Sequence, residues 1–353
     1  MASGYSFGLF WTEQHVEQHI ERSKTPTIYD VARVSGVSIS TVSRVLNTPE
    51  KVNISTRKKV IDAVTVLGFV PKAEAIVHAR KNVGGVGVLV PFFTAPSFVQ
   101  RTRGVASALA GTEFELIVYT VDSTARLEAY LDVLPMRHRL DGLIIMSMPI
   151  SGRQAEHIRT HRLETVLIEV KHSSFCSVDF DNFEGGRMAA RYLISRGYKR
   201  CAFVGESGVP DYKIFQSDIR LEGFRQQLNE SGVELPDHYV SREPYSRENA
   251  MRQAETLLEL DPPPDAIFAY SDLHAADMLA SARRHGLSIP DDLAIIGFDG
   301  TDIADYLGLT TVDQGLDESG RLAAELLMSR ISDHPRPPQN IRLQPKIMER
   351  QTT

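Results

Sequence analysis

The stretch that decides the fold runs from Thr27 to Asn47 and reads TIYDVARVSGVSISTVSRVLN. Its apolar residues recur at helical spacing on both sides of Gly36, which predicts two short helices joined by a tight glycine turn. Ser38 stands where the second helix would begin and is a favoured amino-terminal cap. Val42 and Val45 would face inward, which leaves hydroxyls, an arginine and an aliphatic side chain outside. Such a face can bind phosphates and read bases in the major groove of DNA.

Basic residues cluster around this stretch. From position 24 to position 81 the chain has ten lysines and arginines against four acids, although the whole chain has a net charge of -6. A third helix, predicted from Asn53, adds three consecutive cations at positions 57–59. A Ser/Thr-rich helix after a glycine turn could be an ordinary solvated surface. The basic surroundings favour DNA binding instead, because the acidic remainder of the chain would be repelled from the same polyanion.

The whole chain has the composition of an ordinary globular protein, with 353 residues, 42% hydrophobic and 24% charged. Its two cysteines, Cys176 and Cys201, are too few for a disulfide framework and lack the spacing of metal ligands, so we expect no metal or cofactor. No apolar run of about 18 residues could span a bilayer, and the amino terminus lacks the pattern of a secretion signal. We therefore expect a cytoplasmic protein.

From Val83 onward, short apolar runs alternate with amphipathic segments. The apolar runs are residues 86–90, 114–119, 142–146, 166–170, 201–205, 266–270 and 293–298. Continuous apolar strands separated by helices predict parallel sheets covered on both faces. Because this body is too long for one open sheet, we expect two doubly wound sheets side by side. A ligand would bind where the strands have their carboxyl ends.

The segment 27–47 closely resembles the headpiece signature T-I-x-D-V-A-x-x-(A/S)-G-V-S-x-x-T-V-S-R-V-L-N of the LacI/GalR family of bacterial transcription regulators. Further matches lie at 60–71, 141–144, 297–299, 309–312 and 343–353, so the resemblance covers about 330 of the 353 residues. It implies a three-helix helix-turn-helix headpiece and hinge, followed by an α/β periplasmic-binding-protein-like core of two doubly wound parallel-sheet subdomains. The resemblance implies that the protein is not an enzyme. It implies a repressor whose affinity for its operator depends on a small polar effector.

The resemblance also implies domain limits and residue roles in DNA binding. Residues 1–25 would be a flexible extension, 26–70 the DNA-binding domain, 71–82 the hinge linker and 83–353 the effector-binding and dimerisation core. The base readers would be Tyr29, Ile39, Ser40 and Arg44. The phosphate contacts would be Thr27, Ser38, Thr41, Ser43, Asn47, Asn53 and Thr56.

The hinge departs from the family pattern. Members usually carry P-N-A-x-A-R-x-L, a helix whose leucine enters the minor groove between central base pairs. Here residues 71–80 read PKAEAIVHAR, which places His78 at the wedge position and Ala75 and Val77 beside it as minor-groove contacts. Either Val77 or Ile76 enters the minor groove in place of the usual leucine, or the operator is bent less than in other family members.

Candidate ligand groups follow the predicted strands. Ser97 comes after the first strand, Glu169 lies in the fourth, and Asp272 and Asp299 follow two later strands, while Arg220 opens a helix. Carboxylates with a guanidinium suit bidentate recognition of vicinal hydroxyls, which favours sugar-like effectors. The alternative is that both aspartates cap helices and the arginine pairs with a surface acid.

The resemblance favours the ligand interpretation. Arg220, Asp272 and Asp299 coincide with effector-contacting positions of sugar-responsive members, whereas Ser97 and Glu169 match more loosely. The tryptophan that some members stack on the sugar is missing, and Phe98, Phe92 or Phe215 could replace it.

Two protomers would pair through the core and set two headpieces about one helical turn apart on a pseudo-palindromic operator. The chain stops after the family's last strand with no heptad tail, which predicts a homodimer. Without the resemblance, the residues leave two alternatives to a repressor open. A solute-binding transport protein would share the core but would have no use for residues 27–47, and a sugar-modifying enzyme would turn over its cleft ligand.

Overall fold

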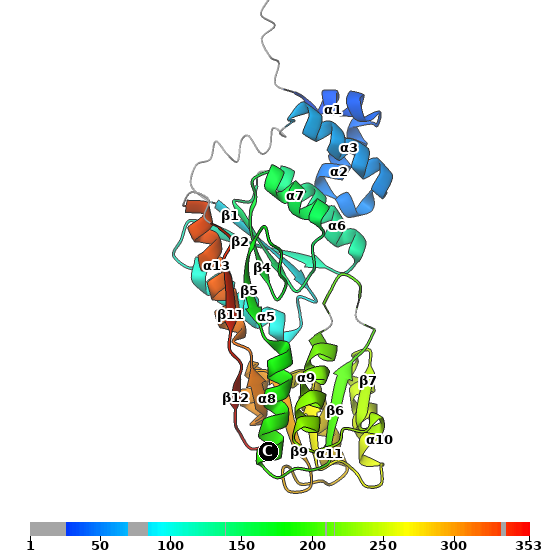
Figure 1. Cartoon of the computed structure of the whole chain (residues 1–353). Coiled ribbons are helices and arrows are strands. Elements are labelled where there is room, and N and C mark those ends of the chain that lie inside the picture. Colours follow the sequence, from blue (N-terminus) through cyan, green and yellow to red (C-terminus); the bar gives the residue numbers. More distant parts are fainter. Residues whose placement is uncertain (1–25, 70–83, 138, 209, 215, 333–336) are drawn as a thin grey trace, which may run out of the picture.

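The computed structural model describes residues 26–69, 84–137, 139–208, 210–214, 216–332 and 337–353 (Figure 1). The predicted extension and the hinge linker, with Ala75, Val77 and His78, lie outside the described residues. Phe215 lies outside them as well.

The head is the predicted three-helix unit. Its elements are α1 (Ile28–Ser35), α2 (Ile39–Asn47), the short 3₁₀ helix η1 (Pro49–Lys51) and α3 (Ile54–Leu67). The amide of Thr27 donates to Asp30 Oδ2 at 3.0 Å, which anchors the start of α1. Gly36 takes a φ of 68° in the turn, a left-handed conformation that glycine adopts without strain. The apolar faces of the three helices meet in one small core that includes Val31 and Val45, both fully buried.

The first subdomain of the body is built on a sheet of order β11-β5-β4-β3-β1-β2. Its strands are β1 (Gly84–Pro91), β2 (Phe114–Val121), β3 (Gly142–Met146), β4 (Glu164–Ile168), β5 (Cys176–Phe180) and β11 (Asn340–Leu343). Its helices are α5 (Pro96–Leu109), α6 (Thr124–Val133), η2 (Leu134–Met136), α7 (Gly152–Thr160) and α13 (Leu316–Ser332). The pairings of this sheet are parallel, as the continuous apolar runs predict.

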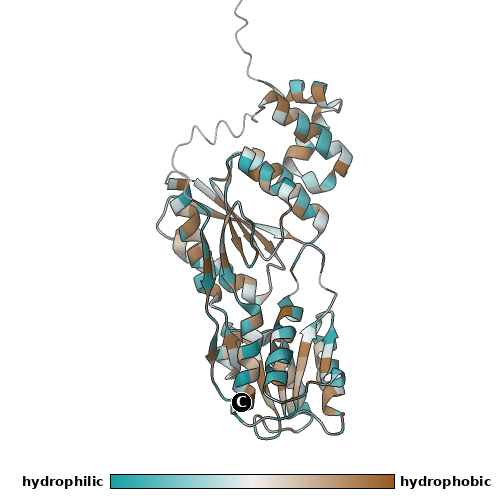
Figure 2. Ribbon diagram, in the orientation of Figure 1, coloured by the Kyte–Doolittle hydropathy of each residue, from teal (hydrophilic) through white to brown (hydrophobic). Residues whose placement is uncertain are grey.

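The second subdomain repeats this arrangement with the order β12-β10-β9-β8-β6-β7. Its strands are β6 (Cys201–Glu206), β7 (Val240–Glu243), β8 (Ala266–Ala269), β9 (Ala294–Asp299), β10 (Thr310–Asp313) and β12 (Lys346–Met348), and only the β10–β12 pairing is antiparallel within the described residues. Its helices are α8 (Asn182–Ser195), α9 (Gln216–Glu230), η3 (Asp237–Tyr239), α10 (Arg247–Leu258), α11 (Asp272–Arg284) and α12 (Asp302–Leu307). Figure 2 shows the hydrophobic strands inside each subdomain and polar residues on the helices around them.

The chain crosses between the subdomains three times, after β5, after β10 and between β11 and β12. Each crossing helix therefore covers the sheet that it enters: α8 packs on α9 in the second subdomain, and α13 packs on α5 in the first. The predicted fold of a helical head and two doubly wound sheets is confirmed.

Glycines bring these helix pairs unusually close together. A Cβ on Gly104 of α5 would lie 1.9 Å from the carbonyl oxygen of Asp317 on α13, and one on Gly320 would lie 2.0 Å from that of Arg101. In the second subdomain, Gly186 on α8 would meet the Arg220 carbonyl oxygen at 2.1 Å. The two pairs thus touch backbone to backbone, with no room for a side chain between them.

The head rests on the first subdomain beside α6 (Figure 1). The side chain of Arg57 on α3 is only 3% exposed, and its Nε lies 3.4 Å from Asp132 Oδ2 while Nη2 lies 3.8 Å from Glu128 Oε2. Val133 and Met136 of the body are buried in the same cluster as the head core. Sequence patterning did not predict this contact between the head and the body.

Candidate DNA-binding face and ligand cavity

The outer face of α2 carries the side chains predicted to read bases. Ile39 is 40% exposed, and Ser40 and Arg44 are exposed beside it. Tyr29 extends from α1 and is 69% exposed. Hydroxyls, a guanidinium and an aliphatic side chain on one exposed helix face can reach base edges and a thymine methyl group in the major groove.

Two helix starts add anion-binding capacity next to this face. Ser38 Oγ accepts the amide of Thr41 at 3.2 Å to cap α2, and Asn53 Oδ1 accepts the amide of Thr56 at 2.8 Å to cap α3. Neither helix has an acid in its first turn. Amide groups and the helix dipole favour negative charge at such ends, which suits DNA phosphates.

The predicted phosphate contacts differ in how far the protein exposes them. Thr27, Ser38 and Asn53 are exposed, and Thr41, Ser43 and Thr56 are half-buried. The side chain of Asn47 lies outside what the structure describes.

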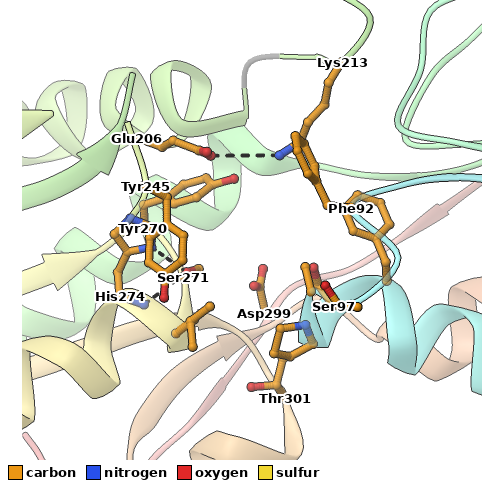
Figure 3. A pocket seen from close by; sticks show the side chains of 15 residues that line it. Phe92, Ser97, Glu206, Lys213, Tyr245, Tyr270, Ser271, His274, Asp299 and Thr301 are labelled. Carbon is orange, nitrogen blue, oxygen red and sulfur yellow. Dashed lines mark hydrogen bonds and ion pairs between the residues drawn. The ribbon is translucent and has the colours of Figure 1, made fainter. Parts of the chain in front are cut away.

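A cavity of about 400 Å³ lies between the two subdomains, at the carboxyl ends of β1, β6, β8 and β9 (Figure 3). Its walls combine aromatic rings with a few polar groups, a composition typical of small-molecule sites. Ser97, Phe98 and Asp299 line it, as the sequence predicted, and Phe92, one of the proposed tryptophan replacements, lines it too.

Asp299 is the last residue of β9 and has a φ of 118°. Its Oδ1 accepts from Gln314 Nε2 at 2.7 Å and lies 3.4 Å from Arg220 Nη1. Burial raises the pKa of this carboxyl, and the Arg220 cation opposes the shift. Among the described residues no hydrogen-bond donor reaches Oδ2, and Asp299 lines the cavity.

Arg220 does not line the cavity, but it contacts Asp299, which does. It occupies the second turn of α9, not its start, because the helix already begins at Gln216. Its guanidinium carbon sits 3.6 Å from the centre of the Phe298 ring, and its Nε donates to Asn182 Oδ1 at 2.8 Å. These contacts fix the guanidinium next to the Asp299 carboxylate.

Glu169, another predicted ligand group, also lies outside the cavity lining. It follows β4, and its carboxylate is bonded to Arg101 Nη2 at 2.5 Å and to the hydroxyl of Ser147. Burial would raise the pKa of Glu169, but Arg101 and Ser147 outweigh burial and hold it below its usual value. The side chain is therefore occupied within the protein, outside the cavity lining.

Asp272 is the third predicted ligand group that does not line the cavity. It is fully buried, and its carboxylate accepts from Thr311 Oγ1 at 2.5 Å and from the amide and hydroxyl of Thr301 at 2.7 and 2.9 Å. Burial and the nearby Asp299 raise its pKa to about 7. Asp272 thus ties α11 to the loop after β9 and to β10.

The sequence analysis missed several cavity residues, among them Glu206, Lys213, Tyr245, Tyr270 and His274. Glu206 and Tyr270 stand at the ends of predicted strands, so the rule that ligands bind at carboxyl ends could have found them. Nothing in the sequence marks Lys213, which lies in the loop between β6 and α9. Burial, together with the nearby Lys213 and Arg220 cations, lowers the pKa of His274 to about 3 and keeps the ring neutral.

Comparison with known proteins identifies the class. Residues 27–72 match the family model "Bacterial regulatory proteins, lacI family", and residues 190–353 match "Periplasmic binding protein-like domain". Catabolite control protein A of Priestia megaterium is 32% identical over 93% of this chain and 99% of its own length. The transcriptional repressor PurR of Vibrio atlanticus is 30% identical over 92% of this chain and 98% of its own.

Solved structures agree with these relatives. A complex of the transcriptional regulator CelR with cellobiose superposes with a TM-score of 0.66 at 28% identity, covering 93% of this chain and all of that one. A LacI-family regulator from Enterococcus faecium with bound ribose gives the same TM-score and identity over 76% of this chain and 98% of that one. The protein is a helix-turn-helix transcription regulator and not an enzyme.

The chain belongs to the LacI family of bacterial regulatory proteins. It combines a sequence-specific DNA-binding head with an effector-binding body. No helix in the described ranges is long and apolar enough to cross a membrane.

Proposed function

We propose that this protein is a cytoplasmic repressor that binds a pseudo-palindromic operator as a homodimer and responds to a sugar-like ligand in the inter-subdomain cavity. The observation that carries the proposal is the position of Asp299, whose Oδ1 is held by Gln314 and Arg220 while Oδ2 is left for a ligand hydroxyl. A carboxylate among aromatic rings is suited to a sugar, which has both hydroxyls and an apolar face.

The DNA-binding part of the proposal rests on the head. Arg44 is exposed on α2 and can form a bidentate contact with guanine, and Tyr29, Ile39 and Ser40 would complete the base-reading set. In the hinge, Ala75 and Val77 would contact the minor groove, with His78 at the wedge position. The family relatives include named repressors, which supports repression as the mode of control.

The ligand part is supported by relatives whose structures contain cellobiose and ribose. Ser97, Phe98 and Asp299 would contact the ligand directly. Arg220 and Asp272, which do not line the cavity, would act by holding Asp299 and the Thr301 loop in place.

Coupling from the cavity to the rest of the body would follow a buried chain of polar contacts. From Asp299 the contacts pass to Gln314, then from Gln314 Oε1 to Arg101 Nη2 at 2.9 Å, and on to Glu169. Asp299 belongs to the second subdomain, and Arg101 and Glu169 belong to the first. A ligand that pulls on Asp299 would therefore shift the angle between the subdomains and with it the spacing of the two heads.

The test is a titration of operator DNA with and without sugars. An operator selected from random DNA would be followed by fluorescence anisotropy with the full-length protein and a panel of neutral and acidic sugars. Asp299→Asn should keep DNA affinity but lose the response to the active sugar. Asp291→Asn, the same change at an exposed position, is the matched control. A response preserved in Asp299→Asn, or no response to any sugar in the panel, would contradict the proposal.

A further inference from the structure

The two walls of the cavity differ in charge (Figure 3). The wall from the second subdomain offers hydrogen-bond acceptors, the carboxylates of Glu206 and Asp299. The opposite wall is formed by residues 92 and 94–98 of the first subdomain, and in Figure 3 Lys213 lies above Phe92 on this side. A ligand that fits must satisfy both walls at once.

The first subdomain contributes the positive end of a helix. α5 begins at Pro96, and the amides of Phe98 and Val99 are bonded to the carbonyl oxygen of Ala95 at 3.0 and 3.1 Å. The amide of Ser97 has no partner in the described part of the chain, and the first turn contains no acid. This helix end therefore favours negative charge in the cavity beside it.

Lys213 adds a full positive charge whose one ion pair among the described residues, with Glu206, is long. Its side chain is only 10% exposed, and its Nζ lies 5.1 Å from the centre of the Phe92 ring. The nearest carboxylate oxygen among the described residues, Glu206 Oε2, is 3.9 Å away, too far for a hydrogen bond. An ammonium group withdrawn from water is stabilised when short hydrogen bonds replace those it has lost.

We propose that the ligand of this regulator is a sugar carrying one anionic group, a carboxylate or a phosphate, which Lys213 and the amino end of α5 bind while Asp299 binds the hydroxyls. This inference rests on the proposed sugar-binding function of the cavity and names the class of sugar. The anion would draw the ammonium to hydrogen-bond distance, and Glu206 would then accept from a ligand hydroxyl.

A neutral sugar would give the Lys213 ammonium and the Ser97 amide weaker hydrogen bonds than an acidic sugar. Lys213 would stay at 3.9 Å from Glu206, and the Ser97 amide would meet only a hydroxyl oxygen. Charge-assisted hydrogen bonds are roughly twice as strong as neutral ones, so an acidic sugar should bind at least about tenfold more tightly than its neutral counterpart.

The experiment compares matched sugars by isothermal titration calorimetry on the full-length protein. The pairs are D-galactose with D-galacturonate, which tests a carboxylate, and D-glucose with D-glucose 6-phosphate, which tests a phosphate. Lys213→Met keeps the length of the side chain and removes its charge. Lys199→Met, at an exposed lysine outside the cavity, is the control.

In the wild-type protein, one acidic sugar should bind at least tenfold more tightly than its neutral partner. Lys213→Met should abolish that preference, and Lys199→Met should keep it. Glu206→Gln gives a second readout that does not require the Lys213 variant to fold: removing the competing carboxylate should tighten binding of the acid.

The outcomes separate the two claims. Neutral sugars that bind as tightly as both acids, or a preference that survives Lys213→Met, would overturn this inference and leave the sugar-binding cavity standing. If no member of either pair binds, both the inference and the sugar-binding function are contradicted.

Discussion

Replacing Gly104 by alanine should strongly destabilise the body, because the helices α5 and α13 touch at this point without a side chain between them. The added Cβ would lie 1.9 Å from the carbonyl oxygen of Asp317, whereas ordinary contacts begin near 3.4 Å. The two helices would have to separate by about 1.5 Å. Overpacking of this kind typically costs about 1–3 kcal/mol, and we expect the upper end because rigid backbone, not a flexible side chain, is in the way.

The assay is equilibrium urea denaturation of Gly104→Ala beside Ser107→Ala, a change at an exposed position on the same helix. The control should unfold within about 0.5 kcal/mol of the wild type. Gly104→Ala should also weaken sugar binding, since α5 carries Ser97 and Phe98 at its cavity end. If Gly104→Ala unfolded at the same urea concentration as the control, the close contact between α5 and α13 would be refuted.

Two further predictions concern the head and the buried carboxylates. Arg44→Ala should cost about 1–3 kcal/mol of operator-binding free energy and relax the sequence preference, whereas Ser43→Ala should weaken binding to all sequences alike. Fluorescence anisotropy with operator and scrambled DNA measures both effects. If both variants bound the operator normally, the recognition helix would be misassigned. The raised pKa of Asp272, about 7 in the folded chain against 3.8 for an ordinary aspartate, means that the folded state holds its proton more tightly, so the free energy of unfolding should fall as pH rises from about 4 through 7. Asp272→Asn should flatten this decline in urea titrations, and an unchanged slope would refute the assignment.

The sequence predicted the fold because its signals are local. Apolar runs such as residues 142–146 and 201–205 become fully buried strands, and Gly36 marks the turn of the head. The same logic found Asp299, the last residue of β9, and Ser97, which lies at the start of α5 after the loop that follows β1.

The remaining site residues depend on contacts between distant parts of the chain, which spacing does not reveal. In the sequence, Asp272 has the position of a ligand group. In the structure, its carboxylate accepts hydrogen bonds from Thr301 and Thr311, which lie far along the chain. Arg220 is withdrawn from the cavity by its stacking on Phe298. Lys213 sits in a loop without a pattern and reaches the cavity only through the tertiary fold.

The buried Arg57 of the head has a mechanical consequence. Because Arg57 is held against Asp132 and Glu128, and because Val133 and Met136 complete the head core, the head is braced on the first subdomain by α6 as well as by the covalent linker. If that subdomain rotated, the head would rotate with it. Because the head lies far from the cavity, a small rotation there would become a larger displacement at the recognition helix. The contact between the head and α6 would also restrict the orientations that the head samples before it binds DNA.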